Sequence, residues 1–164
     1  MIITEADLQA IRTKHRAQRL VLAGGTYDLL HAEHIQHLTF AREQGDVLVV
    51  MLANDIEVHR RKGADRPVMS QSQRAQVIDA LKAVDYTLVR ETAAENGSEE
   101  LMADIANALQ PDVFVLYHET PPAVLQTIRE RIGAIKLVLD MHPRGESTTE
   151  IVARIRAGQS AVKE

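Results

Sequence analysis

The sequence predicts an α/β protein built on a doubly wound, Rossmann-like parallel sheet of five strands, with helices on both faces. Two observations lead to this prediction: five short apolar runs recur along the 164 residues, and a segment with helical periodicity follows each of them. Strands buried on both faces give continuous apolar runs, and strand–helix alternation favours right-handed parallel crossovers. No internal repeat or linker interrupts the pattern, so we expect one domain over residues 1–164 with its core at about 18–157.

The N-terminal half alternates helices with short apolar strands. The run 20-LVLAGG-25 is stopped by two glycines, Thr4 with Asp7 resembles a capping box, and Gly45 ends the second helix. The predicted elements are helices over about 5–17, 32–44 and 71–83 and strands over 20–25 and 47–53. The apolar faces of the three helices are formed by Leu8 and Ile11, by Ile35, Leu38 and Ala41, and by Ala75, Ile78 and Leu81.

The segment 54-NDIEVHRRKGADRPVMS-70 is predicted to be a long polar loop. It is too long for a simple connection, and long loops inside compact domains tend to be functional. Arg60, Arg61 and Lys62 give it a run of positive charge. That run is either a solvated surface patch or an arm that reaches a bound anion.

The C-terminal half continues the same alternation. Prolines 121 and 122 open one helix, Gly133 stops it, and Ser147 or Thr148 can cap the last helix. The predicted elements are strands over 86–89, 112–116 and 135–140, helices over about 98–109 and from the prolines to about 132, and a last helix with Ile151, Val152 and Ile155 facing inward.

Composition excludes several classes of function. Net charge is −4 and aromatic residues are only 3%, which argues against binding of nucleic acid or of a membrane surface. With no Cys there is no disulfide framework, thiol chemistry or zinc–thiolate site. No run approaches 18 apolar residues, and the N-terminus does not resemble a signal peptide, so a cytoplasmic protein is expected.

The carboxyl end of the first predicted strand, 24-GGTYDLLHAEH-34, is the strongest candidate for a site. Doubly wound sheets bind ligands at the carboxyl ends of their strands, where the strand order reverses. Glycines 24 and 25 allow close approach to the backbone, and the following helix start offers N–H groups to an anion. His31 and His34 are three residues apart and can share one helix face. The stretch therefore favours a phosphate site.

Two other interpretations of the histidines remain open. A histidine near a helix start can be a polar cap residue without further function. His31, His34 and His37 could together bind zinc, because imidazoles alone can hold that ion. However, His37 lies about 240° around the helix from His31, so the three do not share one face.

Several motifs together resemble the cytidylyltransferase-like nucleotidyltransferase family. Residues 25–34 resemble a G-x-F-D-x-x-H-x-G-H motif, and the later similarities follow in order at element boundaries. These are Asn54-Asp55, Lys62-Gly63, Arg66-Pro67-Val68, Arg74, 80-ALKAVDY-86, and 145-GESTTEI-151, which is similar to G-x-S-T-T-x-I. The resemblance covers about residues 18–155. It is nearest to glycerol-3-phosphate cytidylyltransferases and the adenylyltransferase domain of ADP-heptose synthesis.

The resemblance implies transfer of a nucleoside monophosphate from CTP or ATP to a phosphorylated sugar or alcohol, with release of pyrophosphate. It also implies Mg²⁺ with the triphosphate, no resident metal, and a homodimer. His31, His34 and Lys62 would be catalytic. The nucleotide-binding residues would be Gly25, Thr26, Tyr27, Arg74, Ser147, Thr148 and Thr149.

The sequence departs from the family pattern at the site. Glu33 replaces the glycine of H-x-G-H, and it adds bulk and a negative charge beside the expected triphosphate. His59 occupies the position of a family lysine, and Tyr117 that of a glycine. These changes leave a second function open: a catalytically impaired relative that keeps the fold and binds a nucleotide, another ligand or a partner.

Overall fold

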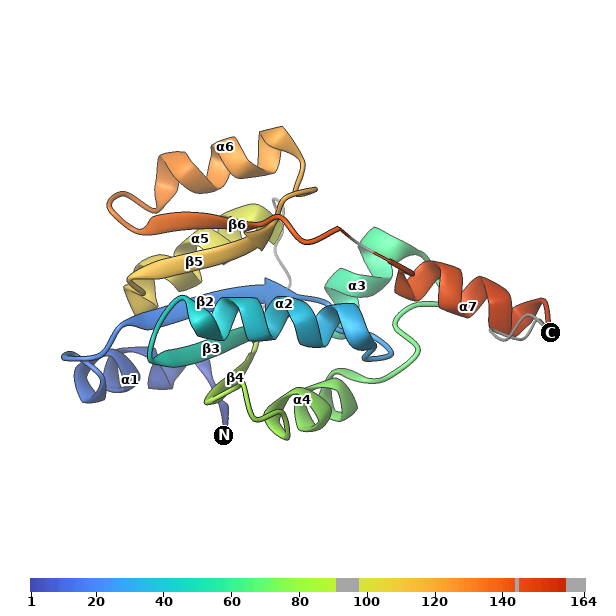
Figure 1. Cartoon of the computed structure of the whole chain (residues 1–164), viewed down its shortest axis with the longest axis horizontal. Coiled ribbons are helices and arrows are strands. Elements are labelled where there is room, and N and C mark those ends of the chain that lie inside the picture. Colours follow the sequence, from blue (N-terminus) through green and yellow to red (C-terminus); the bar gives the residue numbers. More distant parts are fainter. Residues whose placement is uncertain (91–97, 144, 159–164) are drawn as a thin grey trace.

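The computed structural model describes residues 1–90, 98–143 and 145–158, and the rest of the predicted domain lies outside these ranges. The described chain forms a parallel sheet of six strands in the order β1-β4-β3-β2-β5-β6 (Figure 1). The strands are β1 (Ile2–Ile3), β2 (Leu20–Gly25), β3 (Val47–Leu52), β4 (Tyr86–Val89), β5 (Val113–Tyr117) and β6 (Lys136–Asp140). The Rossmann-like α/β class is confirmed, with one strand more than predicted.

The additional strand, β1, lies at the sheet edge. Its two residues pair in parallel with β4, where Ile2 is opposite Thr87 and Ile3 is opposite Leu88. Only Ile3 of the pair is buried. The strand was not predicted because two residues just before a helix do not form a recognisable apolar run. The sheet is therefore wider than the sequence pattern predicts, while its centre is unchanged.

Strand β2 lies where the strand order reverses. From β2 the chain builds β3 and β4 on one side, then crosses over to build β5 and β6 on the other. In register, Ala23 of β2 is opposite Val50 of β3 and Val115 of β5. The carboxyl ends of β2 and β5 thus form the crevice in which this architecture binds ligands.

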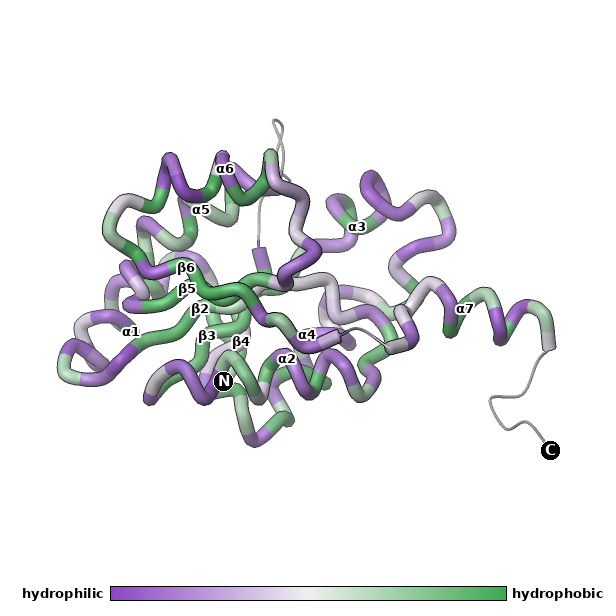
Figure 2. Tube along the Cα trace, turned by 45° about the horizontal axis from the view of Figure 1, so that its top comes forward, coloured by the Kyte–Doolittle hydropathy of each residue, from purple (hydrophilic) through white to green (hydrophobic). Residues whose placement is uncertain are grey.

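Alternate side chains of each strand enter two apolar layers. The helices are α1 (Leu8–Lys14) after a 3₁₀ turn (Glu5–Asp7), α2 (Ala32–Glu43), α3 (Asp55–Lys62), α4 (Gln71–Asp79), α5 (Ser98–Leu109), α6 (Pro122–Arg131) and α7 (Thr148–Arg156). Leu20 and Leu22 face α1, α5 and α6, whereas Val21 and Ala23 face α2 and α4. Figure 2 shows the apolar strands at the centre and the more polar helices around them. Within the described chain, none of the helices is both long and apolar enough to cross a membrane.

The prediction of a long loop over residues 54–70 is wrong for its first half, because residues 55–62 form helix α3. Asn54 caps the helix by accepting a hydrogen bond from the Glu57 N–H at 2.9 Å. Val58 is fully buried, but Ile56 is 65% exposed. With one buried aliphatic residue the segment lacks the repeated apolar spacing that identifies a helix.

The inward faces predicted for two helices are also partly wrong. Ile155 of α7 is 65% exposed, and Ile35 of α2 is 46% exposed. Figure 1 shows α7 extending away from the sheet, so its C-terminal turns have no layer to pack against. Ser147 does cap α7, as one of the two predicted choices, by accepting from the Glu150 N–H.

Truncating one core and one surface side chain tests this assignment of layers. Leu22→Ala should lower the free energy of unfolding by about 2–5 kcal/mol, because it opens a cavity in the central strand. Ile155→Ala should change it by less than about 0.5 kcal/mol. Chemical denaturation of both variants measures the difference. A loss of unfolding free energy in Ile155→Ala as large as that in Leu22→Ala would show that α7 packs against the rest of the domain.

Candidate functional site

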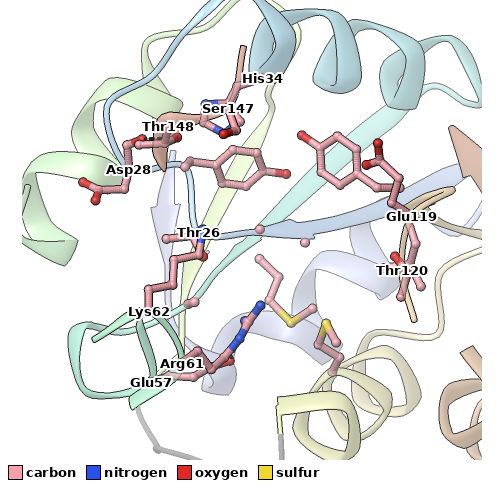
Figure 3. Close-up of a pocket in the computed structure, with 18 of the residues that line it drawn as sticks. Thr26, Asp28, His34, Glu57, Arg61, Lys62, Glu119, Thr120, Ser147 and Thr148 are labelled. Carbon is pink, nitrogen blue, oxygen red and sulfur yellow. Dashed lines mark hydrogen bonds and ion pairs between the residues drawn. The ribbon is translucent and has the colours of Figure 1, made fainter. Parts of the chain in front are cut away.

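A pocket of about 620 Å³ opens at the carboxyl ends of β2, β3 and β5 (Figure 3). The N-termini of α2 and α7 and the last turn of α3 border it. Nine of the ten residues predicted for the site line it: Gly25, Thr26, Tyr27, His31, His34, Lys62, Ser147, Thr148 and Thr149. The tenth, Arg74, does not reach it. The structure thus brings together segments that lie more than 100 positions apart in the sequence.

The end of β2 is shaped by a tyrosine that folds back over a glycine. A Cβ on Gly25 would lie 2.6 Å from the ring of Tyr27, which is too close for any other residue type. The backbone of Tyr27 has φ of +50°, a left-handed conformation that L-residues rarely adopt. Glycine at position 25 therefore lets the turn close tightly at the pocket floor.

Two histidines lie together at the start of α2. His31 is the N-cap residue, and its ring centroid is 3.9 Å from that of His34. The ring of His34 also meets the Tyr27 ring edge-on, with the centroids 5.3 Å apart. Both imidazoles line the pocket beside the positive end of the helix dipole. This placement suits a bound anion.

The hydroxyl of Thr148 connects this turn to α7. Its oxygen donates to the backbone carbonyl of Asp28 at 3.0 Å and lies 3.2 Å from Nε2 of His31. A threonine hydroxyl has one proton, and the carbonyl can only accept. Nε2 of His31 must therefore carry the proton and donate to Thr148. His31 is thereby fixed in one orientation, and the N-terminus of α7 is held beside that of α2.

His37 faces away from the other two histidines. It is 1% exposed, its Nδ1 donates a hydrogen bond to the Asp140 carboxylate at 2.7 Å, and its ring stacks on Tyr117 with centroids 3.7 Å apart. The three histidines do not converge. In the described parts of the chain no group of three or more His, Asp or Glu side chains is arranged to hold a metal ion.

Helix α3 supplies the positive side of the pocket. Arg60, Arg61 and Lys62 line it from the last turn of the helix. Figure 3 labels Arg61 and Lys62 among them. Beneath them Glu57 forms a buried ion pair with Arg90 and a weaker one with Arg61 at 3.4 Å. Burial lowers the pKa of Arg90 to about 10, with the carboxylate of Glu5 opposing that shift. Lys62 is thus carried by a helix anchored to β4, not by a loop.

Arg74 lies beneath the pocket and holds its floor in place. It is 1% exposed and donates to the carbonyls of Thr26 at 2.5 Å, Met69 at 3.0 Å and Ala53 at 2.9 Å. It also pairs with Asp55 at 2.7 Å, at the start of α3. The guanidinium therefore joins the ends of β2 and β3 to α3, which positions the residues that line the pocket.

Asp28 is a structural residue of the site that sequence reasoning did not assign. Its carboxylate is 1% exposed and accepts from Arg66 Nε at 2.7 Å and from the N–H groups of Val68 and Met69 at 2.9 and 3.0 Å. Burial alone would raise the pKa of Asp28, but these hydrogen bonds outweigh it and hold the pKa below its usual value. The cue available in the sequence was the acidic residue that ends GTYD, because a carboxylate does not contribute to a hydrophobic core and must have another role.

Glu33 borders the pocket from the first turn of α2. A Cβ on Gly145 would lie only 2.5 Å from its Oε1, so the carboxylate packs against the backbone that leads to α7. Glu33 and Tyr117 also line a small neighbouring cavity near His37 and Asp140. The glutamate thus forms part of the wall between that cavity and the main pocket.

An α/β sheet with paired histidines and two helix N-termini at its switch point is the arrangement in which nucleotidyltransferase-type folds can accept a phosphate group. The chain belongs to the cytidylyltransferase-like family, whose model matches residues 22–154. This confirms the family that the sequence motifs indicated. The match includes both histidines and the N-terminus of α7.

Curated relatives include bifunctional proteins named HldE. That of Geotalea uraniireducens is 36% identical over 148 residues, which are 88% of this chain and 28% of the relative. That of Sodalis glossinidius is 35% identical over 167 residues, covering 98% of this chain and 33% of the relative. The chain therefore spans about a third of the length of these proteins.

Solved structures share the fold. A lipopolysaccharide core biosynthesis protein from Thermoplasma volcanium GSS1 has a TM-score of 0.61 at 25% identity, over 77% of this chain and 99% of that one. A pantoate–β-alanine ligase from Francisella tularensis has a TM-score of 0.66 at 15% identity, over 88% and 68% of the two chains, and this likeness concerns the fold alone.

Replacing the buried carboxylate at position 28 gives a test with a defined pH dependence. Asp28→Asn should lower the unfolding free energy by about 3–5 kcal/mol at pH 7, because Arg66 is left buried without its partner. Since the folded-state pKa of Asp28 is depressed, its contribution is complete above about pH 4 and is lost as pH falls through the lowered value.

Urea denaturation between pH 7 and pH 3 measures this contribution. The stability gap between the native protein and Asp28→Asn should narrow below about pH 4. Asp65→Asn is the matched control: Asp65 pairs with Arg156 at the surface, where its side chain is 71% exposed, and should cost about 1 kcal/mol or less. A gap at position 28 that does not change with pH would contradict the ion pair.

Proposed function

We propose that the protein is a nucleotidyltransferase that transfers a nucleoside monophosphate from ATP or CTP to a phosphorylated small molecule, with release of pyrophosphate. The observation that carries this proposal is the convergence of His31, His34, Lys62 and the N-terminus of α7 on one pocket. His34, Lys62 and the helix N-termini offer hydrogen-bond donors or positive charge that match a polyphosphate. His31 contributes by tying the start of α2 to Thr148.

The reaction needs no covalent intermediate on the protein. A phosphate oxygen of the acceptor attacks the α-phosphorus of the triphosphate in line. A new phosphorus–oxygen bond forms, the bond to the bridging oxygen breaks, and pyrophosphate leaves with that electron pair. The protein contributes by positioning the reactants and by neutralising the negative charge that develops.

Each pocket group has a role in this scheme. His34 and the amide groups at the start of α2 would contact the α-phosphate. Lys62 would reach the β- and γ-phosphates from α3, and Thr149 would present its hydroxyl group to the leaving pyrophosphate. Ser147 and Thr148 would hold the N–H groups at the start of α7 toward it, because their own hydroxyl protons are donated to Glu150 and to the Asp28 carbonyl. Thr26 and the Gly25 backbone would line the turn below. Arg74 would act by holding that turn, since it lies outside the pocket.

Mg²⁺ is proposed to accompany the triphosphate. Mg²⁺ is commonly held by substrate phosphates and one or two carboxylates. The carboxylate of Glu33 lies at the pocket wall but packs toward Gly145, so the phosphate oxygens would be the main ligands of the ion. The ion would neutralise phosphate charge. The resemblance of the motifs to the adenylyltransferase domain of ADP-heptose synthesis favours ATP and a sugar phosphate as substrates. A homodimer and a cytoplasmic location stay predictions.

Glu33 supports a second candidate, a catalytically impaired relative that binds a ligand or partner. Two unit charges of like sign 4 Å apart repel by about 4 kcal/mol at an effective dielectric constant of 20. Glu33 lines the pocket, so its charge opposes a polyphosphate there. Against this candidate, its carboxylate packs toward Gly145, and His34, Lys62 and Thr149 line the pocket beside it.

A pyrophosphate-release screen tests the proposed activity. Mg-ATP and Mg-CTP are each combined with glycerol 3-phosphate and a panel of sugar phosphates. One pairing should release pyrophosphate, and His34→Asn should lower kcat/KM by about 100-fold or more, as loss of one transition-state donor does. His15→Asn, at the C-cap of α1 and away from the pocket, should retain the rate. Absence of release from every pairing would contradict an active transferase and favour the impaired relative.

Two substitutions at Glu33 separate the effect of its charge from that of its bulk. If charge opposes the triphosphate, Glu33→Gln should tighten Mg-ATP binding by up to about tenfold, which is about 1.4 kcal/mol. Glu33→Gly should add little more, because the side chain packs toward the loop. Titration calorimetry measures both. Binding that exists only in Glu33→Gly would mean that bulk closes the native site, as the impaired relative requires.

A further inference from the structure

The hydroxyl of Tyr27 is buried at the pocket without a hydrogen-bond partner. Tyr27 is 2% exposed, and among the described residues no donor or acceptor pairs with its oxygen. A buried hydroxyl left unsatisfied costs about 1–3 kcal/mol. The motif that this segment resembles has phenylalanine at the position, so the hydroxyl group is a feature of this chain. Its cost calls for a physical reason.

Tyr27 carries a second cost in its backbone. Its φ of +50° places a bulky L-residue in the left-handed region, at an expense of order 1–3 kcal/mol. Residues held in this way gather at ligand sites, where surrounding structure enforces them. Here Arg74 holds the preceding carbonyl, and the side chain of Asp28 anchors the following residue. The turn is thus held in a conformation that aims this ring across Gly25.

The neighbours of the ring are the groups that would bind phosphate. The hydroxyl-bearing end of the ring lies over Gly25, and its edge meets His34. Burial raises the pKa of Tyr27 well above its usual value, and the nearby phenol of Tyr117 adds to that shift. The hydroxyl therefore keeps its proton and remains a donor over the whole physiological range. A protonated donor pairs most strongly with an ionised oxygen.

We propose that the Tyr27 hydroxyl donates a hydrogen bond to a phosphate oxygen of the bound nucleoside triphosphate, next to His34. This inference rests on the proposed function and adds a donor that the family motif lacks. In the free protein the hydroxyl is unsatisfied, and in the complex the phosphate satisfies it. Compared with phenylalanine at position 27, tyrosine then lowers the stability of the free protein and raises the stability of the nucleotide complex.

Tyr27→Phe tests this inference, because it removes one oxygen and keeps the ring. Tyr86→Phe is the matched control: the Tyr86 hydroxyl lies outside the pocket and is paired with His15 Nε2 at 2.8 Å and Lys14 Nζ at 3.0 Å. Thermal unfolding without ligand is measured for the native protein and both variants. Dissociation constants are measured by calorimetry for Mg-ATP, Mg-CTP, magnesium tripolyphosphate and adenosine.

The two variants should behave in opposite ways. Without ligand, Tyr27→Phe should melt at the same or a higher temperature than the native protein, whereas Tyr86→Phe should melt lower. Tyr27→Phe should weaken the binding of Mg-ATP and of magnesium tripolyphosphate by a similar factor of about tenfold or more. This is the usual effect of losing a hydrogen bond to a charged group. Tyr86→Phe should leave both affinities unchanged.

Other outcomes would overturn the inference. Unchanged affinity of Tyr27→Phe, or a loss of stability without ligand like that of Tyr86→Phe, would mean that the hydroxyl serves the fold. Weaker binding of Mg-ATP with unchanged tripolyphosphate would assign the hydroxyl to the nucleoside, against our proposal. If the native protein binds no triphosphate, the proposed function fails as well. If it binds normally and only the Tyr27→Phe effects are missing, the proposed function stands without this contact.

Discussion

The site depends on one hydroxyl group, that of Thr148. It donates to the Asp28 carbonyl and accepts from His31, across a separation of 120 residues. Helix α7 extends away from the sheet (Figure 1), and near its start the Glu33 carboxylate packs against Gly145. The hydroxyl therefore decides whether the N-termini of α2 and α7 face the same space. Without it the pocket would keep its floor but lose one wall.

Buried polar groups fix the turn after β2, which carries the Asp28 carbonyl that Thr148 contacts. The carboxylate of Asp28 accepts three hydrogen bonds from residues 66–69, and Arg74 joins the ends of β2 and β3 to α3. Desolvating these charges is expensive, so they contribute geometry more than net stability. They keep the turn after β2 in a strained conformation at Tyr27, where an apolar core would let it relax. A rigid floor of this kind suits a reaction that proceeds by positioning.

Sequence reasoning predicted the parts of the fold that burial determines. Strands such as 47–52 are continuous apolar runs, and apolar repeats identified most of the helices. It missed α3, where Val58 is the one buried aliphatic residue, and the two-residue β1. It identified nine pocket-lining residues from motif order but could not show where a long side chain points. Arg74 therefore emerged as a support beneath the pocket, and Glu33 as part of its wall.

The most direct measurement is the affinity of Mg-ATP and Mg-CTP for the native protein and for Thr148→Val, determined by titration calorimetry. Valine keeps the shape of threonine and removes the hydroxyl group. If Thr148 assembles a triphosphate site from two distant segments, the native protein binds at least one of the two nucleotides and the variant binds it about tenfold or more weakly while remaining folded. Equal affinity in the two proteins, or no binding by the native protein, would contradict the account.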